Sequence, residues 1–170
     1  MRLLLYGFGP YHRFRTNITE AIVRQFPKHR WTKKVVFPVR FRKSQFINAV
    51  RDYRPDVILG LGQCSRGRRL RVESTAVNQR RDSKTEKARP IVAGGFRRLS
   101  TNLKLNLGPA ARSSSDAGDY VCNYSMYIIL DFLKRRRLAT RFGFVHVPCG
   151  YDSRKAIRSL ERATRKIETG

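Results

Sequence analysis

Short apolar runs alternate with segments of helical periodicity along the first part of the chain. A run such as Leu3-Leu4-Leu5 is apolar at every position, which is typical of a strand buried on both faces. Strands of that kind separated by helices indicate βαβ units, so we predict an α/β fold around a mainly parallel, twisted sheet. The predicted strands and helices of this part are, in order, residues 2–6, 17–26, 35–39, 44–53 and 56–61.

The rest of the chain adds elements of both kinds. Residues 70–77 alternate as one strand, with Leu70 on one face and Glu73 on the other. Residues 79–115 are polar and basic, and we expect mostly irregular structure there. Because no linker or repeat divides the chain, residues 1–170 are predicted to form a single domain. The further predicted elements are a weak strand at 110–114, a helix from Cys122 to about 137, a strand at 142–147 and an amphipathic helix at 153–168.

Net charge is the outlying feature of the composition. The chain has 37 Lys and Arg residues against 12 Asp and Glu, which gives a formal charge of +25. Such a charge favours RNA or another polyanion as partner, although a proteome adapted to heat or acid would give a merely solvated basic surface. The candidate polyanion-binding residues are Arg66, Arg68, Arg69, Arg135, Arg136, Arg137, Arg158, Arg162 and Arg165.

Cysteine usage indicates a reducing compartment. Cys64, Cys122 and Cys149 form an odd set without compact spacing, so we expect no disulfide framework and a cytoplasmic location. The spacing also lacks paired metal-binding cysteines, and we expect neither a metal nor a cofactor. Leu3-Leu4-Leu5 is too short for a signal peptide, and no stretch approaches a membrane span.

Cys122 stands where a helix is predicted to begin, after a turn at Gly118. Backbone N–H groups in a first helical turn have no partner within the helix, and the helix dipole adds partial positive charge there. That environment favours a thiolate nucleophile, although a lone cysteine under an apolar helix is as often a small buried core residue. The local pattern alone does not separate the two interpretations.

Two other residues could complete a catalytic group. His146 lies at the carboxyl end of a predicted strand, which is the sheet edge where α/β folds place their sites. Glu73 is a carboxylate inside an alternating strand, and a buried carboxylate needs a partner. The three would form a nucleophile, a base and an orienting carboxylate. Most chains contain such scattered sets, so residue types alone are weak support.

Longer motifs strengthen the interpretation of these three residues as a catalytic group. The chain resembles the pyroglutamyl peptidase I, or pyrrolidone-carboxylate peptidase, family of cysteine peptidases along nearly its whole length. The blocks around Cys122 and His146 are the specific ones. The matching segments are Gly7-Phe8-Gly9-Pro10-Tyr11, Asn17, Gly62-Gln63, Val72-Glu73, Ala76-Val77-Asn78, Pro90-Ile91-Val92, Ser115 to Asn123, Met126-Tyr127 and Gly143 to Pro148.

The resemblance implies a fold, an activity and residue roles. It implies a three-layer α/β/α sandwich of the phosphorylase/hydrolase type and removal of an N-terminal pyroglutamyl residue through a thioester acyl-enzyme. Cys122 would be the nucleophile, His146 the general base and then acid, and Glu73 the residue that holds His146. The substrate-binding positions would be Phe8, Tyr11, Gln63, Val121 and Asn17, which suits an uncharged lactam held by apolar faces and a few hydrogen bonds.

The chain also departs from the family pattern, as a short and very basic member. The family's glycine pair after the aromatic positions is His12-Arg13 here, and its Gly-Gly-Arg after the glutamine is Ser65-Arg66-Gly67. Residues 79–115 are shorter and basic where the family has an acidic loop and a helix. In the family, those segments enclose the substrate and join subunits. The sequence therefore leaves two questions undecided, namely whether the pocket closes over a substrate and whether the chain forms a homo-oligomer.

A second function therefore stays open beside the peptidase. A catalytically retired or secondary-function member of the fold would bind RNA or a ribosome through its basic surface. The sequence shows no nucleic-acid-binding motif. The presence of Cys122, His146 and Glu73 together favours the hydrolase.

Overall fold

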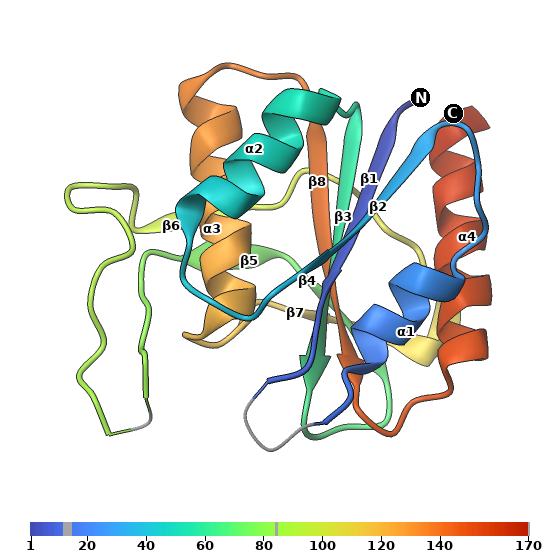
Figure 1. The fold of residues 1–170 in the computed structure, drawn as a ribbon, viewed down its shortest axis with the longest axis horizontal. Helices are drawn as coiled ribbons and strands as arrows, with labels where there is room; N and C mark the ends of the chain where they lie inside the picture. The colour runs from blue at the N-terminus through green and yellow to red at the C-terminus, as the bar shows by residue number, and fades with distance from the viewer. Residues whose placement is uncertain (12–14, 84, 170) are drawn as a thin grey trace.

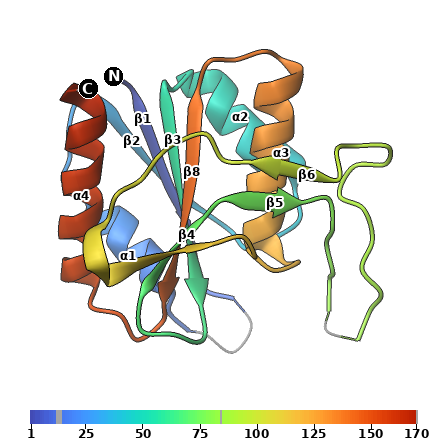
Figure 2. The ribbon, with the colours of Figure 1, turned by 180° about the vertical axis from the view of Figure 1, so that it is seen from behind.

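The computed structural model describes residues 1–11, 15–83 and 85–169, and it contains a six-stranded sheet with helices on both faces (Figure 1, Figure 2). The strand order is β2-β1-β3-β8-β4-β7. The three central strands β1, β3 and β8 are buried along almost their whole length, which explains their unbroken apolar runs. The strands of this sheet are β1 (Leu3–Phe8), β2 (Thr32–Phe37), β3 (Val57–Cys64), β4 (Leu70–Glu73), β7 (Ala111–Ser114) and β8 (Arg141–Pro148).

The sheet is mainly parallel, as predicted. Strands β2, β1, β3 and β8 pair in parallel, whereas β4 runs antiparallel to β8 and carries β7 parallel to itself. The carboxyl ends of β1, β3 and β8 therefore meet at one edge. The chain leaves β1 toward one face of the sheet and β2 toward the other, so the region beside β1 and β3 is a topological switch point, where α/β folds bind ligands.

Four helices of the described residues complete the predicted three layers. Helices α1 and α4 cover one face of the sheet, and α2 and α3 cover the other (Figure 1). Adjacent residues of β8 point into different cores, Phe144 toward α2 and α3 and Val145 toward α1 and α4. None of these helices is both long and apolar enough to cross a membrane. The helices are α1 (Ile18–Gln25), α2 (Lys43–Tyr53), α3 (Val121–Arg135) and α4 (Ser153–Thr169).

The junction between β1 and α1 is fixed by hydrogen bonds and close packing. Asn17 caps the helix, as predicted, since its Oδ1 accepts from the Thr19 backbone N–H at 3.0 Å. The Thr19 hydroxyl in turn accepts from the Phe8 backbone N–H at 3.0 Å. A Cβ atom at Gly7 would lie 2.9 Å from the Thr19 carbonyl oxygen, so only glycine lets α1 approach β1 this closely. This junction places Phe8 at the switch point.

The predicted single strand at 70–77 is wrong. The chain leaves the main sheet after Glu73, and residues 75–77 pair with a strand that the sequence did not predict. Buried Asn123 on α3 fixes this small sheet by donating to the carbonyl oxygens of Val77 and Gln79 and accepting from the Val77 N–H. The two strands are β5 (Thr75–Val77) and β6 (Arg98–Ser100).

Other boundaries differ in smaller ways. Strand β1 runs on to Phe8 instead of ending before Gly7, and β2 covers 32–37 instead of 35–39. Residues 101–107 have no regular secondary structure and lead through a 3₁₀ turn, η1 (Gly108–Ala110), into β7, so the predicted irregular segment with a strand near its end is confirmed.

Candidate active site

Two side chains meet over one glycine at the carboxyl edge of the sheet. His146 lies in β8, and Cys122 lies in the first turn of α3. A Cβ atom built on Gly62 of β3 would lie 2.6 Å from Cys122 Sγ and 2.9 Å from His146 Cδ2. The sulfur and the imidazole therefore contact the same small space, and only a glycine leaves room for both.

A buried carboxylate holds the other side of the imidazole. Glu73 Oε1 lies 2.7 Å from His146 Nδ1, and the two side chains are 0% and 5% exposed. An ionised carboxylate only accepts hydrogen bonds, so Nδ1 carries the proton and Nε2 is left as an acceptor. The structure thus brings together Cys122, His146 and Glu73, which are scattered in the sequence.

Arg71 is a fourth member of this cluster that the sequence analysis did not single out. Its Nε lies 3.5 Å from Glu73 Oε1, and it stands directly opposite His146 in the pairing of β4 with β8. Both His146 and Arg71 therefore approach the same oxygen, Oε1, while Glu73 Oε2 is buried without a hydrogen-bond partner among the described residues, and the Arg71 charge offsets part of the cost of burying the carboxylate. Arg71 and Glu73 are two apart in a strand and share a face, but nothing sets one arginine apart among 37 basic residues.

The Cys122 thiol is protonated at rest. Burial raises its pKa to about 12, with Cys64 and Glu73 acting in the same direction and Arg71 against them. The predicted stabilisation of a thiolate by the start of α3 is therefore outweighed by desolvation. No side chain caps this end of α3, so its first-turn N–H groups stay available to a ligand. The thiol consequently needs a base at the moment of attack.

The other two cysteines are free thiols as well. Cys64, at the end of β3, lines the same pocket as Cys122, and burial raises the pKa of its thiol. Cys149 is exposed and donates a backbone hydrogen bond to the Cys64 carbonyl oxygen at 2.9 Å. Among the described residues, no group of three His, Cys, Asp or Glu side chains is placed to hold a metal ion.

A small pocket of about 260 Å³ opens beside the sulfur. Phe8 and Val121 form apolar walls and are each 2% exposed. Tyr11 and Tyr120 form a further wall, with ring centroids 6.3 Å apart and planes inclined by 36°. The predicted positions Phe8, Tyr11 and Val121 thus lie in one cavity with Cys122 and His146. The pocket is the size of a single ring and its immediate substituents.

Gln63 and Asn17 also line this pocket, and their side-chain amides differ in how many hydrogen bonds they already make. Gln63 Oε1 accepts from the Ile18 backbone N–H at 2.9 Å, which fixes the amide, and its buried Nε2 has no hydrogen-bond partner among the described residues. Asn17 is already committed through both ends of its amide, since Nδ2 donates to the Gly9 carbonyl oxygen at 3.0 Å. Gln63 therefore offers a donor to a ligand, whereas Asn17 orders the junction of β1 with α1.

None of the described residues of the shortened segment 79–115 lines the pocket. Its first part extends away from the sheet as an arm between β5 and β6 (Figure 1). The base of this arm is tied by Asn78, which accepts from the Ile91 and Val92 N–H groups and donates to the Val92 carbonyl oxygen. The substituted pair His12-Arg13 lies outside the described residues.

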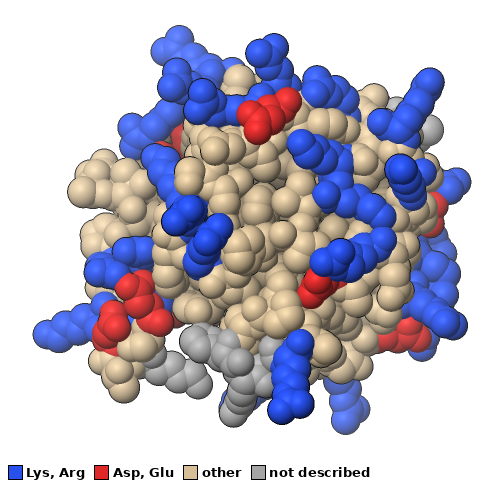
Figure 3. Space-filling view, viewed as in Figure 1, with Lys and Arg blue, Asp and Glu red and all other residues tan. Residues whose placement is uncertain are grey.

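The candidate polyanion-binding arginines are not brought together. Residues 66, 68 and 69 lie in the loop between β3 and β4, residues 135–137 at the end of α3, and the other three on α4, across the sheet from α3. Arg135 and Arg165 form ion pairs within their own helices, with Asp131 and Glu161. Lys and Arg side chains are spread over the face shown in Figure 3 and do not follow a single stripe.

Comparison of sequences groups this chain with one set of proteins. Residues 95–160 match the profile of the family described as pyroglutamyl peptidase. The pyrrolidone-carboxylate peptidase of Halalkalibacterium halodurans is 32% identical, with 88% of this chain and 85% of that protein aligned. Pyrrolidone-carboxylate peptidase 1 of Saccharolobus solfataricus is 29% identical, with 87% and 79% aligned.

Comparison of structures gives the same grouping at the level of the fold. The pyrrolidone carboxyl peptidase of Thermococcus litoralis superposes with a TM-score of 0.86 at 22% identity, over 96% of this chain and 91% of that one. The E192V mutant of the Pyrococcus furiosus protein gives 0.87 at 21% identity, over 97% of both chains.

Proposed function

The chain belongs to the pyroglutamyl peptidase family, and from this we propose that it is a cysteine peptidase that removes an N-terminal pyroglutamyl residue from peptides. The observation that carries the proposal is the cluster at Gly62. A nucleophilic sulfur, an imidazole and a buried carboxylate converge there from α3, β8 and β4 beside a ring-sized pocket.

Attack begins with a proton transfer. Because the Cys122 thiol is protonated at rest, His146 Nε2 takes the Sγ proton as sulfur attacks the carbonyl carbon of the pyroglutamyl residue. Glu73 stabilises the imidazolium that forms, through the 2.7 Å contact with Nδ1. The imidazolium then protonates the leaving amine as the C–N bond breaks, which leaves a thioester on Cys122. Water, deprotonated by His146, hydrolyses this thioester and releases pyroglutamate.

The pocket suits an uncharged lactam. Phe8, Val121 and the tyrosine rings supply apolar surface on either side of a ring, and Gln63 Nε2 supplies a donor to the lactam carbonyl. The uncapped N–H groups at the start of α3 are placed to stabilise the oxyanion of the tetrahedral intermediate.

The experiment that tests the proposal is turnover of pyroglutamyl-7-amido-4-methylcoumarin. Wild type and a Cys149→Ala variant are expected to release the fluorophore at similar rates, because Cys149 is exposed and does not line the pocket. Cys122→Ala is expected to release none above background. Absence of turnover in wild type, or equal turnover in Cys122→Ala, would rule out this peptidase mechanism.

The domain organisation and the cellular location are proposed together with this function. We propose that residues 1–170 form one peptidase domain, because both apolar cores pack on the same sheet. A cytoplasmic location is proposed from the three free thiols, which persist in reducing compartments.

A further inference from the structure

A second cavity lies away from Cys122, at the opposite edge of the sheet. It is a groove of about 950 Å³ between α2 and α3. Residues 54–56, which lead into β3, and residues 138–141, at the start of β8, lie side by side along it, because the Thr140 hydroxyl donates to the Pro55 carbonyl oxygen at 2.7 Å. The peptidase mechanism makes no use of this groove, so its composition calls for a separate explanation.

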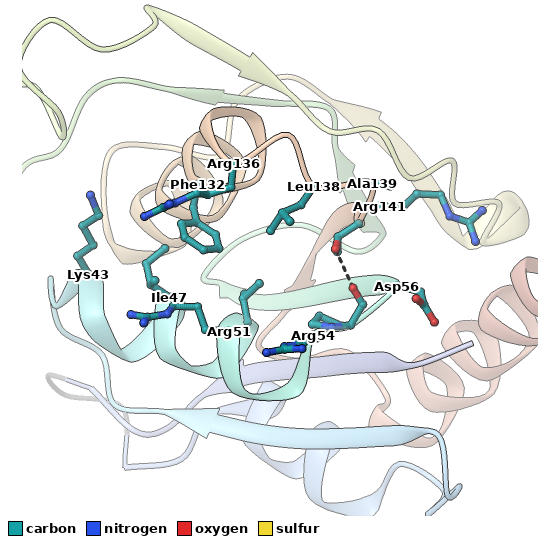
Figure 4. Close-up of a pocket in the computed structure, with 13 residues that line it drawn as sticks. Lys43, Ile47, Arg51, Arg54, Asp56, Phe132, Arg136, Leu138, Ala139 and Arg141 are labelled. Carbon is teal, nitrogen blue, oxygen red and sulfur yellow. Dashed lines mark hydrogen bonds between the residues drawn. The ribbon is translucent and has the colours of Figure 1, made fainter.

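The floor of the groove is apolar. Ile47 and Val50 come from α2, and the ring of Phe132 points from α3 toward them (Figure 4). Leu138 projects over the same space and is 43% exposed, which makes it one of two large apolar residues with exposed side chains among the described residues. Ile47 and Val50 are themselves only 8% and 2% exposed, so a partner with apolar side chains would mainly cover Leu138 and the half-buried Phe132.

The rim of the groove is basic and unpaired. Lys43, Arg51 and Arg54 come from α2 and its end, and Arg136 comes from the end of α3 (Figure 4). Within the described part of the chain, none of the four lies within 4.0 Å of a carboxylate oxygen or is engaged by another side chain. Asp56, the one carboxylate that lines the groove, accepts from the Arg2 backbone N–H at 2.6 Å.

The positive charge of the rim exceeds the negative charge that the fold places beside it. Two helices end beside the groove, and each carboxyl end has a partial charge of about −0.5, so together they offset roughly one cation. For the four rim cations, roughly two positive charges then remain after Asp56 is counted, and Arg141, which also lines the groove, adds another. A chain of net charge +25 with 12 acidic residues is a poor complement to this rim, so a second copy is not the expected occupant.

We propose that this groove binds an acidic peptide segment of a partner protein, with its apolar side chains on Ile47, Phe132 and Leu138 and its carboxylates on the four rim cations. RNA fits less well, because single strands are held by aromatic faces that stack on bases, and this floor is mainly aliphatic. The groove lies at the amino edge of the sheet, so the proposal does not depend on the peptidase function.

Fluorescence polarisation tests this directly. The probe is a labelled peptide of about 12 residues in which Leu and Phe are interspersed with Glu, a length that spans about three helical turns. Wild type is expected to bind it, and Arg51→Glu with Arg136→Glu to weaken binding at least about tenfold. Leu138→Ser is expected to weaken it about threefold to tenfold, through lost apolar contact. Circular dichroism and thermal unfolding of each variant check that the fold is retained.

The matched control reverses two exposed arginines on α4. Arg158→Glu with Arg162→Glu makes the same change in net charge on the other face of the sheet, and should leave peptide binding within about twofold. Equal weakening in this control would overturn the proposal, because binding would then reflect diffuse charge. So would absence of binding, or equal affinity for a peptide of Glu alone. A uridine oligonucleotide that binds more tightly with the same dependence on Arg51 and Arg136 would assign the groove to nucleic acid, and self-association lost in that variant would assign it to a second copy.

Discussion

Replacing Glu73 by glutamine tests the electrostatic part of the proposed mechanism. The side chain is fully buried and contacts His146 Nδ1 at 2.7 Å. Glutamine has nearly the same shape, and its Oε1 can still accept the Nδ1 hydrogen bond. The substitution therefore removes the negative charge that stabilises the imidazolium while it keeps the imidazole in place.

The expected loss follows from the geometry. A 2.7 Å contact puts the centres of the carboxylate and imidazolium charges about 4 Å apart, which corresponds to about 4 kcal/mol at an effective dielectric constant of about 20. Arg71 already neutralises part of the carboxylate, so we expect about 2–4 kcal/mol in the barrier, or a fall in kcat of about 30-fold to 1000-fold. KM should change little, because neither Glu73 nor Arg71 lines the pocket.

Arg71 supplies the discriminating second variant. With the carboxylate gone, its guanidinium is left unopposed beside the imidazole and disfavours the imidazolium further. Arg71→Gln added to Glu73→Gln should therefore recover part of the lost kcat.

The assay is steady-state turnover of the pyroglutamyl coumarin amide, with Glu161→Gln as control. Glu161 also lies between an arginine and a histidine, Arg165 and His29, but on α4, outside the pocket. A Glu73→Gln enzyme that is folded and keeps kcat within about threefold of wild type would refute the assigned role.

Three further outcomes are expected. Gly62→Ala should lower turnover at least about 100-fold, because its Cβ would lie 2.6 Å from Cys122 Sγ and 2.9 Å from His146 Cδ2; activity near that of wild type would show that the site tolerates this displacement. Inactivation by iodoacetamide should speed up about tenfold per unit between about pH 6 and 9, since burial raises the pKa of Cys122 to about 12, and a plateau below about pH 8 would instead indicate a preformed thiolate. Asn123→Ala should lower the free energy of unfolding by about 2–4 kcal/mol in denaturant titrations, because it leaves the Val77 N–H and the Gln79 carbonyl oxygen without this partner, and a loss no larger than that of exposed Asn48→Ala would contradict this.

The centre of the fold was predictable from local pattern because it is buried on both sides. Strands β1, β3 and β8 read as unbroken apolar runs, and the periodicity of α2 and α4 reports which face packs on the sheet. The edges were less predictable. Strand β2 begins with Thr32-Lys33-Lys34, whose extended conformation comes from pairing with β1, and β6 has one buried side chain, Leu99.

The break after Glu73 could not be predicted from the alternation of residues 70–77, which continues without interruption. The chain changes sheets because Ser74 donates its backbone N–H to Ser114 and its carbonyl accepts from Thr101, both distant in sequence. This break decides the site, because Glu73 becomes the last residue of β4 beside β8.

A protonated thiol fits the chemistry of the pocket better than the resting thiolate that the start of a helix would favour. The walls are Phe8, Val121 and tyrosine rings, and an uncharged lactam enters them most easily when the sulfur beside them is also uncharged. In the proposed mechanism, charge then develops only during attack, as an imidazolium beside Glu73 and an oxyanion beside the first turn of α3. The dipole of α3 therefore acts on the transition state, where its stabilisation lowers the barrier, and has little effect on the resting enzyme.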